Sequence, residues 1–303
     1  MIRIPSYLKK GDHIGIVCPS GYMAYEKAAA CIEVLQQWGY RVKPGKTLGN
    51  QFHYFSGTDE ERMLDLQEML DDTEVKAILC GRGGYGMSRI IDGLDFRQFK
   101  KNPKWLIGFS DITALHAHVY RNFKIATLHA PMAAAFNDDE YKNEFVQSLR
   151  KALKGDLTKY KTGAHMLNRA GNAGGELIGG NLSLVAHLIG TNSSFITKGK
   201  ILFLEDVGEY IYNVDRMMIQ LKRAGMLHQL AGLIIGGFSE MKDTTIPFGA
   251  DVFSVIHDHV KEYDYPVCFD FPVSHEKNNY ALKVGVQHIL TISKSRTTLK
   301  ELR

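Results

Sequence analysis

Short apolar runs alternate with helix-like segments through the first half of the sequence. The runs His13–Cys18, Val75–Cys80 and Trp105–Ile107 have the length and composition of buried strands. Between them, Tyr25–Gly39 and Thr58–Leu70 place apolar residues at the spacing of one helix face. This alternation predicts a parallel sheet with helices on both faces, so the expected fold class is α/β.

Three unusual segments directly follow predicted strands. They are Pro19–Gly21, the glycine-rich Gly81–Gly86 and the turn Gly108–Ser110. Ligands of parallel α/β sheets bind at the carboxyl ends of the strands. Because all three segments lie at carboxyl ends, we expect them to face one site.

Ser110 stands where an apolar strand turns abruptly into a helical pattern. Such a turn lifts a serine hydroxyl out of the fold and surrounds it with the first N–H groups of the helix, which can stabilise an oxyanion. This is the arrangement of a nucleophile elbow, although Ile112 replaces the second glycine of G-x-S-x-G. The alternative is that Ser110 or Asp111 only caps the helix, as both residue types commonly do.

The run Gly81–Gly86 (GRGGYG) indicates a backbone pocket for an anion, since glycines let N–H groups approach a ligand closely. No Gly-Lys-Ser/Thr follows, so the run is not a P-loop. We expect it to hold a developing oxyanion or a substrate carboxylate, with Arg82 as a clamp. The alternatives are a tight strand-to-helix turn and a solvated surface arginine.

Residues 151–172 are polar and irregular, and we interpret them as a linker between domains at 1–150 and 173–303. The second domain has shorter and more varied elements, which predict a smaller α/β unit with a partly antiparallel sheet. Its predicted strands are 176–180, 200–204, 232–237, 267–271 and 287–293, and its predicted helices are 182–188, 212–224 and 251–263.

Two segments of this second domain carry groups suited to acid–base chemistry. Glu205 and Asp206 follow an apolar strand, where acids orient a histidine, bind a metal or merely cap a turn. No metal-ligand partner stands at short spacing from them, so we reject a metal site. His275 lies in a loop after a strand, a common place for functional residues, although any one of twelve histidines is ordinarily a surface or core residue.

Other side chains are weaker candidates. His116 and His118 lie two residues apart on a predicted helix and point to different faces, whereas His129 follows the next strand and is a fallback base. Cys80 would be a rival nucleophile as a thiolate beside a helix. It closes a buried apolar strand, however, and we interpret it as a core cysteine.

Composition and charge exclude several classes of protein. A net charge of +4 over 303 residues, without Lys/Arg blocks, indicates neither nucleic-acid nor membrane binding. The four cysteines are far apart and form neither a disulfide pattern nor a zinc pattern. Free thiols, the absence of a signal-peptide layout and the absence of an apolar run of ~20 residues lead us to expect a cytoplasmic protein.

The order of these segments resembles the LD-carboxypeptidase family of serine peptidases. The similarity covers almost the whole chain, because the matching segments occur in the family's order. They are Gly15–Ser20, Gly81–Gly86, Ile107–Ile112, Gly179–Leu182, Phe203–Asp206 and Ser274–His275 with Asn279. The resemblance implies a Rossmann-like N-terminal domain and a smaller C-terminal α/β domain, with the active site at their interface.

The resemblance also implies residue roles. Ser110 would be the nucleophile, His275 the general base, and Glu205 the acid that orients His275. The N–H groups of Asp111 and Gly84 would form the oxyanion hole. The residues expected to contact substrate are Arg82, Tyr85 and Asn181.

By the same resemblance, the expected activity is release of terminal D-alanine from murein tetrapeptides during peptidoglycan recycling, by a cofactor-free homodimer. One alternative is a microcin C-type immunity hydrolase that acts on aminoacyl-nucleotide analogues. That enzyme would need an aromatic platform, and Trp38 and Trp105 both fit a core instead. The other alternative is a non-catalytic peptide-binding protein.

Ser274 and Lys283 depart from the family, which commonly has Gly and Pro at these two positions.

Overall fold

The computed structural model describes residues 2–137 and 140–302. The chain divides into two compact units. The first unit comprises Met1–Asp156 with Tyr280–Lys283, and the second comprises Leu157–Asn279 with Val284–Arg303. The sequence predicts an uninterrupted second domain over 173–303, whereas the structure returns Tyr280–Lys283 to the first unit.

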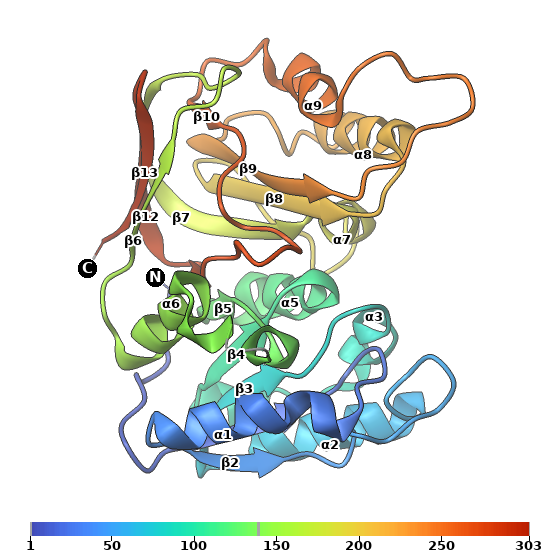
Figure 1. Cartoon of the computed structure of the whole chain (residues 1–303), viewed down its shortest axis with the longest axis vertical. Helices are drawn as coiled ribbons and strands as arrows, with labels where there is room; N and C mark the ends of the chain where they lie inside the picture. The colour runs from blue at the N-terminus through green and yellow to red at the C-terminus, as the bar shows by residue number, and fades with distance from the viewer. Residues whose placement is uncertain (1, 138–139, 303) are drawn as a thin grey trace. The chain divides into compact units, whose positions relative to one another are not determined.

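The first unit is built on a six-stranded sheet in the order β11-β5-β4-β3-β1-β2. Figure 1 labels its strands β2, β3, β4 and β5. Its strands are β1 (His13–Val17), β2 (Arg41–Pro44), β3 (Val75–Cys80), β4 (Trp105–Gly108), β5 (Thr127–His129) and β11 (Leu282–Val284). The pairs β1–β2, β1–β3, β3–β4 and β4–β5 are all parallel, which confirms the predicted parallel sheet. β4 is buried at every position, because a parallel sheet is covered on both faces.

Polar contacts fix the segment that returns to this unit. Tyr280 Oη donates to Glu144 Oε2 (2.6 Å), and Ala281 N donates to Ser148 Oγ (2.9 Å). β11 follows and forms the edge of the first sheet. A strand of three residues has too few positions to show a hydrophobic period, so the sequence gives no signal of this return.

Helices connect the strands of the first unit. The longest, α2, begins with a capping box in which Thr58 Oγ1 accepts from Glu61 N and the Glu61 carboxylate accepts from Thr58 N. The α-helices are α1 (Ala29–Gln37), α2 (Asp59–Asp71), α3 (Met87–Ile90), α4 (Arg97–Lys101), α5 (Thr113–Phe123) and α6 (Glu144–Lys154). The 3₁₀ segments are η1 (Tyr25–Ala28), η2 (Ile91–Gly93), η3 (Ser110–Ile112), η4 (Ala133–Phe136) and η5 (Glu140–Lys142).

The strand order of the first sheet reverses between β1 and β3. From β1 the chain moves outward to β2, and it then returns past β1 to β3, β4 and β5. Ligands of open α/β sheets bind at such a reversal, beyond the carboxyl ends of the strands. The loops at this point are Pro19–Gly21 after β1 and Gly81–Gly86 after β3, and Ser110 follows the neighbouring β4.

The second unit is built on a seven-stranded mixed sheet in the order β10-β9-β8-β7-β12-β13-β6 (Figure 1). Its strands are β6 (Lys159–Gly163), β7 (Gly171–Asn181), β8 (Ile201–Val207), β9 (Gly232–Ser239), β10 (Val267–Cys268), β12 (Gln287–Ile292) and β13 (Arg296–Glu301). β7 pairs antiparallel with β12 through its first half and parallel with β8 through its second half. This confirms the predicted partly antiparallel sheet. The helices of this unit are α7 (Leu182–His187), α8 (Ile211–Arg223) and α9 (Val252–Val260).

The segment 151–172, which the sequence suggests is a linker, contains the end of α6, all of β6 and the start of β7. β6 pairs with β13 at the edge of the second sheet and exposes Lys159 and Lys161. Charged side chains on an edge strand discourage pairing with another chain. Because β6 is mostly polar, its hydrophobic pattern does not predict a strand.

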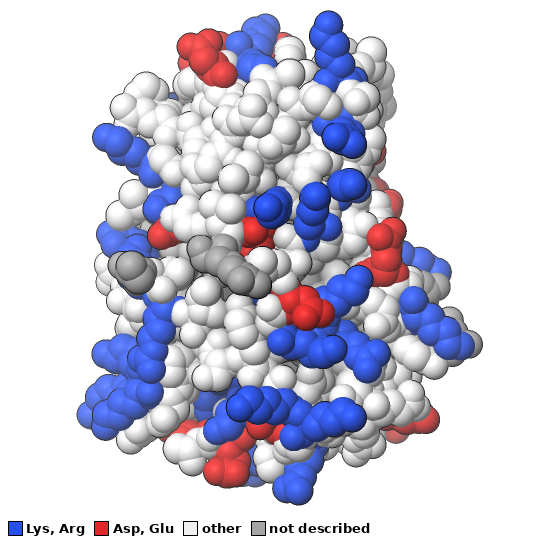
Figure 2. Space-filling view, turned by 90° about the vertical axis from the view of Figure 1, so that its left-hand side faces the viewer, with Lys and Arg blue, Asp and Glu red and all other residues white. Residues whose placement is uncertain are grey.

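Both tryptophans, Trp38 and Trp105, are buried in the first unit, as expected. Among the helices that the described residues form, none is both long enough and apolar enough to cross a membrane. On the face drawn in Figure 2, Lys and Arg side chains are dispersed among neutral ones rather than collected into one stripe. This distribution agrees with the slight net charge of +4.

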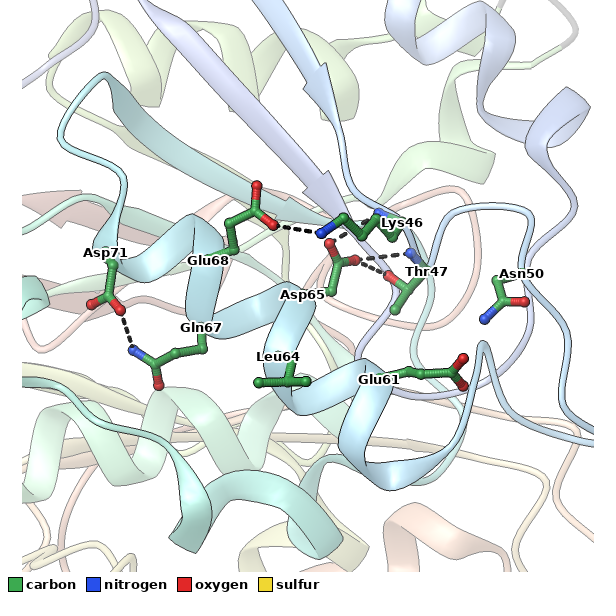
Figure 3. Close-up of a pocket in the computed structure, with 9 residues that line it drawn as sticks. All are labelled: Lys46, Thr47, Asn50, Glu61, Leu64, Asp65, Gln67, Glu68 and Asp71. Atoms are coloured by element: carbon green, nitrogen blue, oxygen red, sulfur yellow. Dashed lines mark hydrogen bonds and ion pairs between the residues drawn. The ribbon is translucent and has the colours of Figure 1, made fainter.

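Asp65 ties α2 to the loop after β2 (Figure 3). Its buried carboxylate accepts from Lys46 N (2.9 Å), Thr47 N (2.9 Å) and Thr47 Oγ1 (2.5 Å). Thr47 Oγ1 in turn accepts from Cys18 N (2.8 Å), just after β1. One carboxylate therefore connects a helix, a loop and the carboxyl end of β1.

We expect Asp65→Ala to lower the free energy of unfolding by about 2 kcal/mol, because it leaves buried N–H and O–H donors without an acceptor. Urea denaturation measures this change. Asp71→Ala is the matched control on the same helix: Asp71 is exposed, so its loss should cost under about 0.5 kcal/mol. Equal effects of the two substitutions would contradict the role given to Asp65.

Candidate functional site

Ser110 forms a strained elbow between β4 and α5. It has φ +63°, in the left-handed region that non-glycine residues rarely occupy. Such a conformation costs on the order of 1–2 kcal/mol and persists where the surroundings enforce it, most often at functional sites. A serine that only caps a helix has extended backbone angles. The conformation therefore favours the elbow over the simple cap.

The glycine-rich run lies against this elbow. A Cβ on Gly83 would lie 2.9 Å from Ser110 Cβ and 3.1 Å from Ser110 Oγ, so only glycine fits. Gly84, the expected oxyanion donor, is the next residue and has φ +103°. The structure thus brings the run and Ser110 together within the first unit, as the position of both at carboxyl ends of strands predicts.

The Asp111 side chain links the loops around Ser110. Its buried Oδ2 accepts from Ser20 Oγ (2.6 Å) and from Met87 N (2.8 Å). Ser20 lies in the loop after β1, and Met87 directly follows the glycine-rich run and begins α3. From the sequence we expected Asp111 either to cap the helix or to supply its backbone N–H to the oxyanion hole, and the bonds of its carboxylate to the two loops were not predicted. In the sequence, the only sign of this role is that Asp111 directly follows the elbow serine.

Arg62 holds the same two loops from the side of α2. It is fully buried and donates to the carbonyl oxygens of Pro19 and Gly86. Desolvation by burial lowers the pKa of Arg62, although Asp59 and Asp111 act in the opposite direction. The sequence reading missed Arg62, because in an amphipathic helix a charged residue is ordinarily assigned to the solvent face.

Three of the weaker candidates of the first unit, Cys80, His116 and His129, are buried. The fourth, His118, is partly exposed, and its ring lies 5.2 Å from that of Phe96. Burial raises the pKa of the Cys80 thiol far above its ordinary value, which suits a core cysteine and not a nucleophile. His116 bonds the Gly108 carbonyl through Nε2 (2.8 Å), and burial lowers its pKa to about 4. His129 is buried with its ring 5.8 Å from that of Phe109.

In the second unit, Glu205 and His275 form a hydrogen-bonded pair. His275 Nδ1 lies 2.6 Å from Glu205 Oε2. Glu205 is fully buried, and its other oxygen has no hydrogen-bond partner among the described residues. A buried carboxylate so placed favours a positive charge on the imidazole beside it. The His275 side chain is 17% exposed, which leaves its ring open to a reactant.

Opposing effects set the pKa of His275. Desolvation by burial, the largest, lowers it, but the hydrogen bond and charge of Glu205, followed by Asp206 and Glu240, together raise it above the ordinary value of 6.5. The geometry, a histidine oriented through Nδ1 by a buried carboxylate, is that of a general base held in one tautomer.

A bulge in the sheet aims Glu205 at the histidine loop. The β8–β9 register is regular up to Leu204 and resumes at Asp206, so that Gly236 and Gly237 both lie opposite the single Glu205. Bulges of this kind redirect side chains and occur beside active sites. A Cβ on Gly236 would lie 2.2 Å from Val273 O, so the glycine lets the loop before His275 approach β9 closely. The sequence reading gave these two glycines no role.

Asp206 points to the other side of β8. It accepts from Asn181 Nδ2 (2.8 Å), Ser183 N (3.0 Å) and Val207 N (2.9 Å). Burial, reinforced by the charge of Glu205, raises the pKa of Asp206 to about 7. Asn181, expected to contact substrate, also caps α7 by accepting from Leu184 N. Asn181 ends β7, and its bonds to Asp206, Ser183 and Leu184 N stabilise the start of α7.

The other expected substrate contacts are exposed on the glycine-rich run. Arg82 donates one N–H to Tyr22 O (2.7 Å), and its remaining donors are available because Arg carries five. Tyr85 is half-exposed, with its ring 6.0 Å from that of Phe55. Ser274, before His275, accepts from Glu276 N and donates to Asn278, which shapes the histidine loop.

A cavity of about 520 Å³ lies elsewhere, on α2 and the loop after β2 (Figure 3). It includes none of the predicted site residues, and the carboxylates of Asp65, Glu68 and Asp71 along it are bonded to neighbouring groups. Among the residues that the structure describes, no three His, Cys, Asp or Glu side chains are grouped as a metal site. The cavity therefore offers no ligand chemistry comparable to that around Ser110.

Comparison with known proteins extends over both units. Models of the LD-carboxypeptidase N-terminal domain and C-terminal domain match residues 14–130 and 174–290. The probable murein peptide carboxypeptidase of Bacillus subtilis is 33% identical over 98% of this chain and 94% of its own length.

Two solved structures illustrate the likeness in fold. Muramoyltetrapeptide carboxypeptidase from Oxalobacter formigenes superposes with a TM-score of 0.87 at 28% identity, covering 96% of this chain and 99% of that one. The microcin C7 self immunity protein MccF in complex with aspartyl sulfamoyl adenosine gives a TM-score of 0.88 at 23% identity, covering 98% of each chain.

We expect Glu205→Gln to lower the pKa of His275, because the charge that outweighs burial is lost while burial remains. An NMR titration of the His275 ring measures this change. Glu276→Gln is the control: this neighbouring acid is exposed, and its removal should shift the pKa much less. A His275 pKa that is unchanged or higher in Glu205→Gln would show that Glu205 does not set it.

Proposed function

Because the chain belongs to the LD-carboxypeptidase family of serine peptidases, we propose that it hydrolyses the L–D peptide bond that releases terminal D-alanine from murein tetrapeptides. The observation that supports the proposal is that each unit holds one preorganised group: the first a serine in a strained left-handed elbow, and the second a histidine oriented by a buried carboxylate. These are the two halves of a Ser-His-Glu triad formed by Ser110, His275 and Glu205.

In the proposed acylation, His275 Nε2 accepts the proton of Ser110 Oγ as that oxygen attacks the scissile carbonyl carbon. The tetrahedral intermediate then collapses, the C–N bond breaks, and His275 delivers its proton to the nitrogen of the leaving D-alanine. Glu205 holds Nδ1 protonated and stabilises the imidazolium. Water, deprotonated by His275, then cleaves the acyl-serine and regenerates Ser110 Oγ–H.

The oxyanion of each tetrahedral intermediate would accept from the N–H groups of Asp111 and Gly84. The contact between Gly83 and Ser110 supports this choice, since it places the run beside the nucleophile. The loss of one such donor costs on the order of 3 kcal/mol of transition-state stabilisation. Arg82, with donors left after its bond to Tyr22 O, would bind the terminal carboxylate. Tyr85 and Asn181 complete the proposed substrate contacts.

Two further features belong to the same proposal. We propose a cytoplasmic enzyme, because all four cysteines are free and buried, which suits a reducing compartment. We also propose that the reaction needs no cofactor or metal, because the three triad residues supply the nucleophile, the base and its orienting acid. The proposed homodimeric state follows from the family resemblance alone.

We expect wild-type protein to release D-alanine from L-Ala-γ-D-Glu-L-Lys-D-Ala or its diaminopimelate counterpart, and Ser110→Ala to lower kcat by about 10⁴-fold or more. Release is measured with a D-amino-acid assay. Ser194→Ala, a part-exposed serine of the second unit, is the control and should retain activity.

Full turnover by Ser110→Ala would remove Ser110 from the mechanism. Release from neither peptide would overturn the substrate, and aminoacyl sulfamoyl adenosine would then test the microcin-type alternative. Binding of the peptide without turnover by wild type would support the non-catalytic alternative.

We expect kcat/KM to fall as the pH falls through a midpoint above 6.5. The pKa of His275 is raised in the folded protein, so the imidazole becomes protonated, and unable to accept the serine proton, at a higher pH than an ordinary histidine. Initial rates between pH 5 and pH 9 measure the profile. A midpoint below 6.5 would contradict the assignment of His275 as the base.

A further inference from the structure

A short aromatic hairpin lies beside the glycine-rich run. Phe52 and Phe55 exchange both backbone hydrogen bonds (2.9 and 3.0 Å), and His53 takes a left-handed φ of +54° to make the turn. Phe52 and Tyr54 are nevertheless 47% and 51% exposed. Large aromatic side chains in a tightly bonded turn are preorganised, so they lose little freedom when a ligand binds.

Backbone bonds fix this hairpin to the run. Tyr22 N donates to Tyr54 O (2.9 Å), and Gly21 N donates to Gly83 O (3.0 Å). The loop after β1 thus joins the hairpin on one side and the glycine-rich run on the other. Gly83 is also the residue that packs against Ser110. Tyr54 is therefore held in a fixed place relative to the elbow.

The Tyr54 hydroxyl lies at Gly84. A Cβ on Gly84 would lie 2.7 Å from Tyr54 Oη, so a glycine is needed for the phenol to occupy this place. Among the residues that the structure describes, no hydrogen-bond partner is found for this hydroxyl, and the side chain is half-exposed. A phenol O–H that is positioned by backbone contacts and bonded to no protein group is a donor open to a ligand.

Arg82 approaches the same point. A Cβ on Gly21 would have Arg82 Nε at 3.7 Å and Tyr54 Cε1 at 3.8 Å. The bond from Arg82 to Tyr22 O fixes the guanidinium in this place (2.7 Å). The Arg82 guanidinium and the Tyr54 ring therefore both lie beside Gly21, and the Tyr54 hydroxyl lies beside Gly84, whose Cβ would stand 3.6 Å from Gly21 Cα. A cation and a hydroxyl donor beside these neighbouring glycines suit a carboxylate, because its two oxygens can accept from both.

Resting on the proposed function, we propose that Tyr54 is a specificity-determining residue whose hydroxyl donates to the terminal carboxylate of the leaving D-amino acid, which Arg82 also binds. Gly83 lies against Ser110, and its neighbours in the chain are Arg82 and the Gly84 at which the Tyr54 hydroxyl lies, so both donors belong to the segment beside the nucleophile. The terminal carboxylate of the substrate is one residue removed from the scissile carbonyl, so it too would bind beside Ser110. The site would thus select a free carboxyl terminus over a longer or blocked peptide.

The test compares L-Ala-γ-D-Glu-L-Lys-D-Ala with the same peptide ending in D-alaninamide, using wild type, Tyr54→Phe and Tyr25→Phe. Tyr54→Phe removes only the hydroxyl, and it should lower kcat/KM for the free acid by about tenfold while changing the amide by less than about twofold. Tyr25→Phe, which removes another half-exposed phenol hydroxyl of the first unit, should change neither. Folding is checked by thermal unfolding of each variant.

A binding measurement tests the role of Tyr54 separately from the proposed hydrolysis. Calorimetry on Ser110→Ala, with and without Tyr54→Phe, should show a Kd about tenfold higher for the acid alone. If wild type releases no D-alanine but this selective loss of binding is found, the reaction is wrong and the carboxylate site stands. Equal losses for acid and amide, no loss for either, or no binding of either peptide would overturn the role of Tyr54.

Discussion

Two buried charges of opposite sign hold the loops at the carboxyl end of the first sheet. Arg62 donates to the carbonyl oxygens of Pro19 and Gly86, and Asp111 accepts from Ser20 Oγ and Met87 N. Each side chain therefore bonds both the loop after β1 and the end of the glycine-rich run. A buried charge that loses its partners carries a large desolvation cost, so neither loop can move away without a penalty of several kcal/mol. This constraint enforces the strained backbone of Ser110, which a free loop would relax.

In the second unit, two glycines rather than buried charges allow the close packing that positions Glu205 and His275. Gly236 and Gly237 oppose Glu205 across a bulge, and the chain before His275 lies close against them. Glu205 on β8 can then bond His275 Nδ1, although His275 lies in a loop 70 residues further along the chain. Where the first unit uses charge to fix its loops, the second uses the absence of Cβ atoms.

In both units, an acid directly follows the proposed catalytic residue and turns the other way. Asp111 follows Ser110 and bonds the neighbouring loops, and Asp206 follows Glu205 and bonds Asn181 and Ser183 N. On β8 successive side chains point to opposite sides of the strand, so Glu205 reaches His275 while Asp206 anchors the neighbouring segment. Ser110 and Asp111 belong instead to the 3₁₀ segment η3, where the Asp111 carboxylate bonds the loops around the elbow. Neighbouring acids that look alike in the sequence therefore have separate tasks, one chemical and one positional.

The sequence by itself determined most strands and helices, the parallel first sheet and the serine turn, because apolar periodicity and glycine placement are local properties of the chain. It did not predict α6 or β13. It also indicated that the glycine-rich run and Ser110 would meet, since both end parallel strands. It did not reveal β6, whose edge position allows polar residues, or the return of Tyr280–Lys283 to the first sheet. It also gave no role to Arg62 or to the Gly236–Gly237 bulge. Tertiary structure alone decided these, because a partner distant along the chain determines whether a charge is buried or a glycine is required.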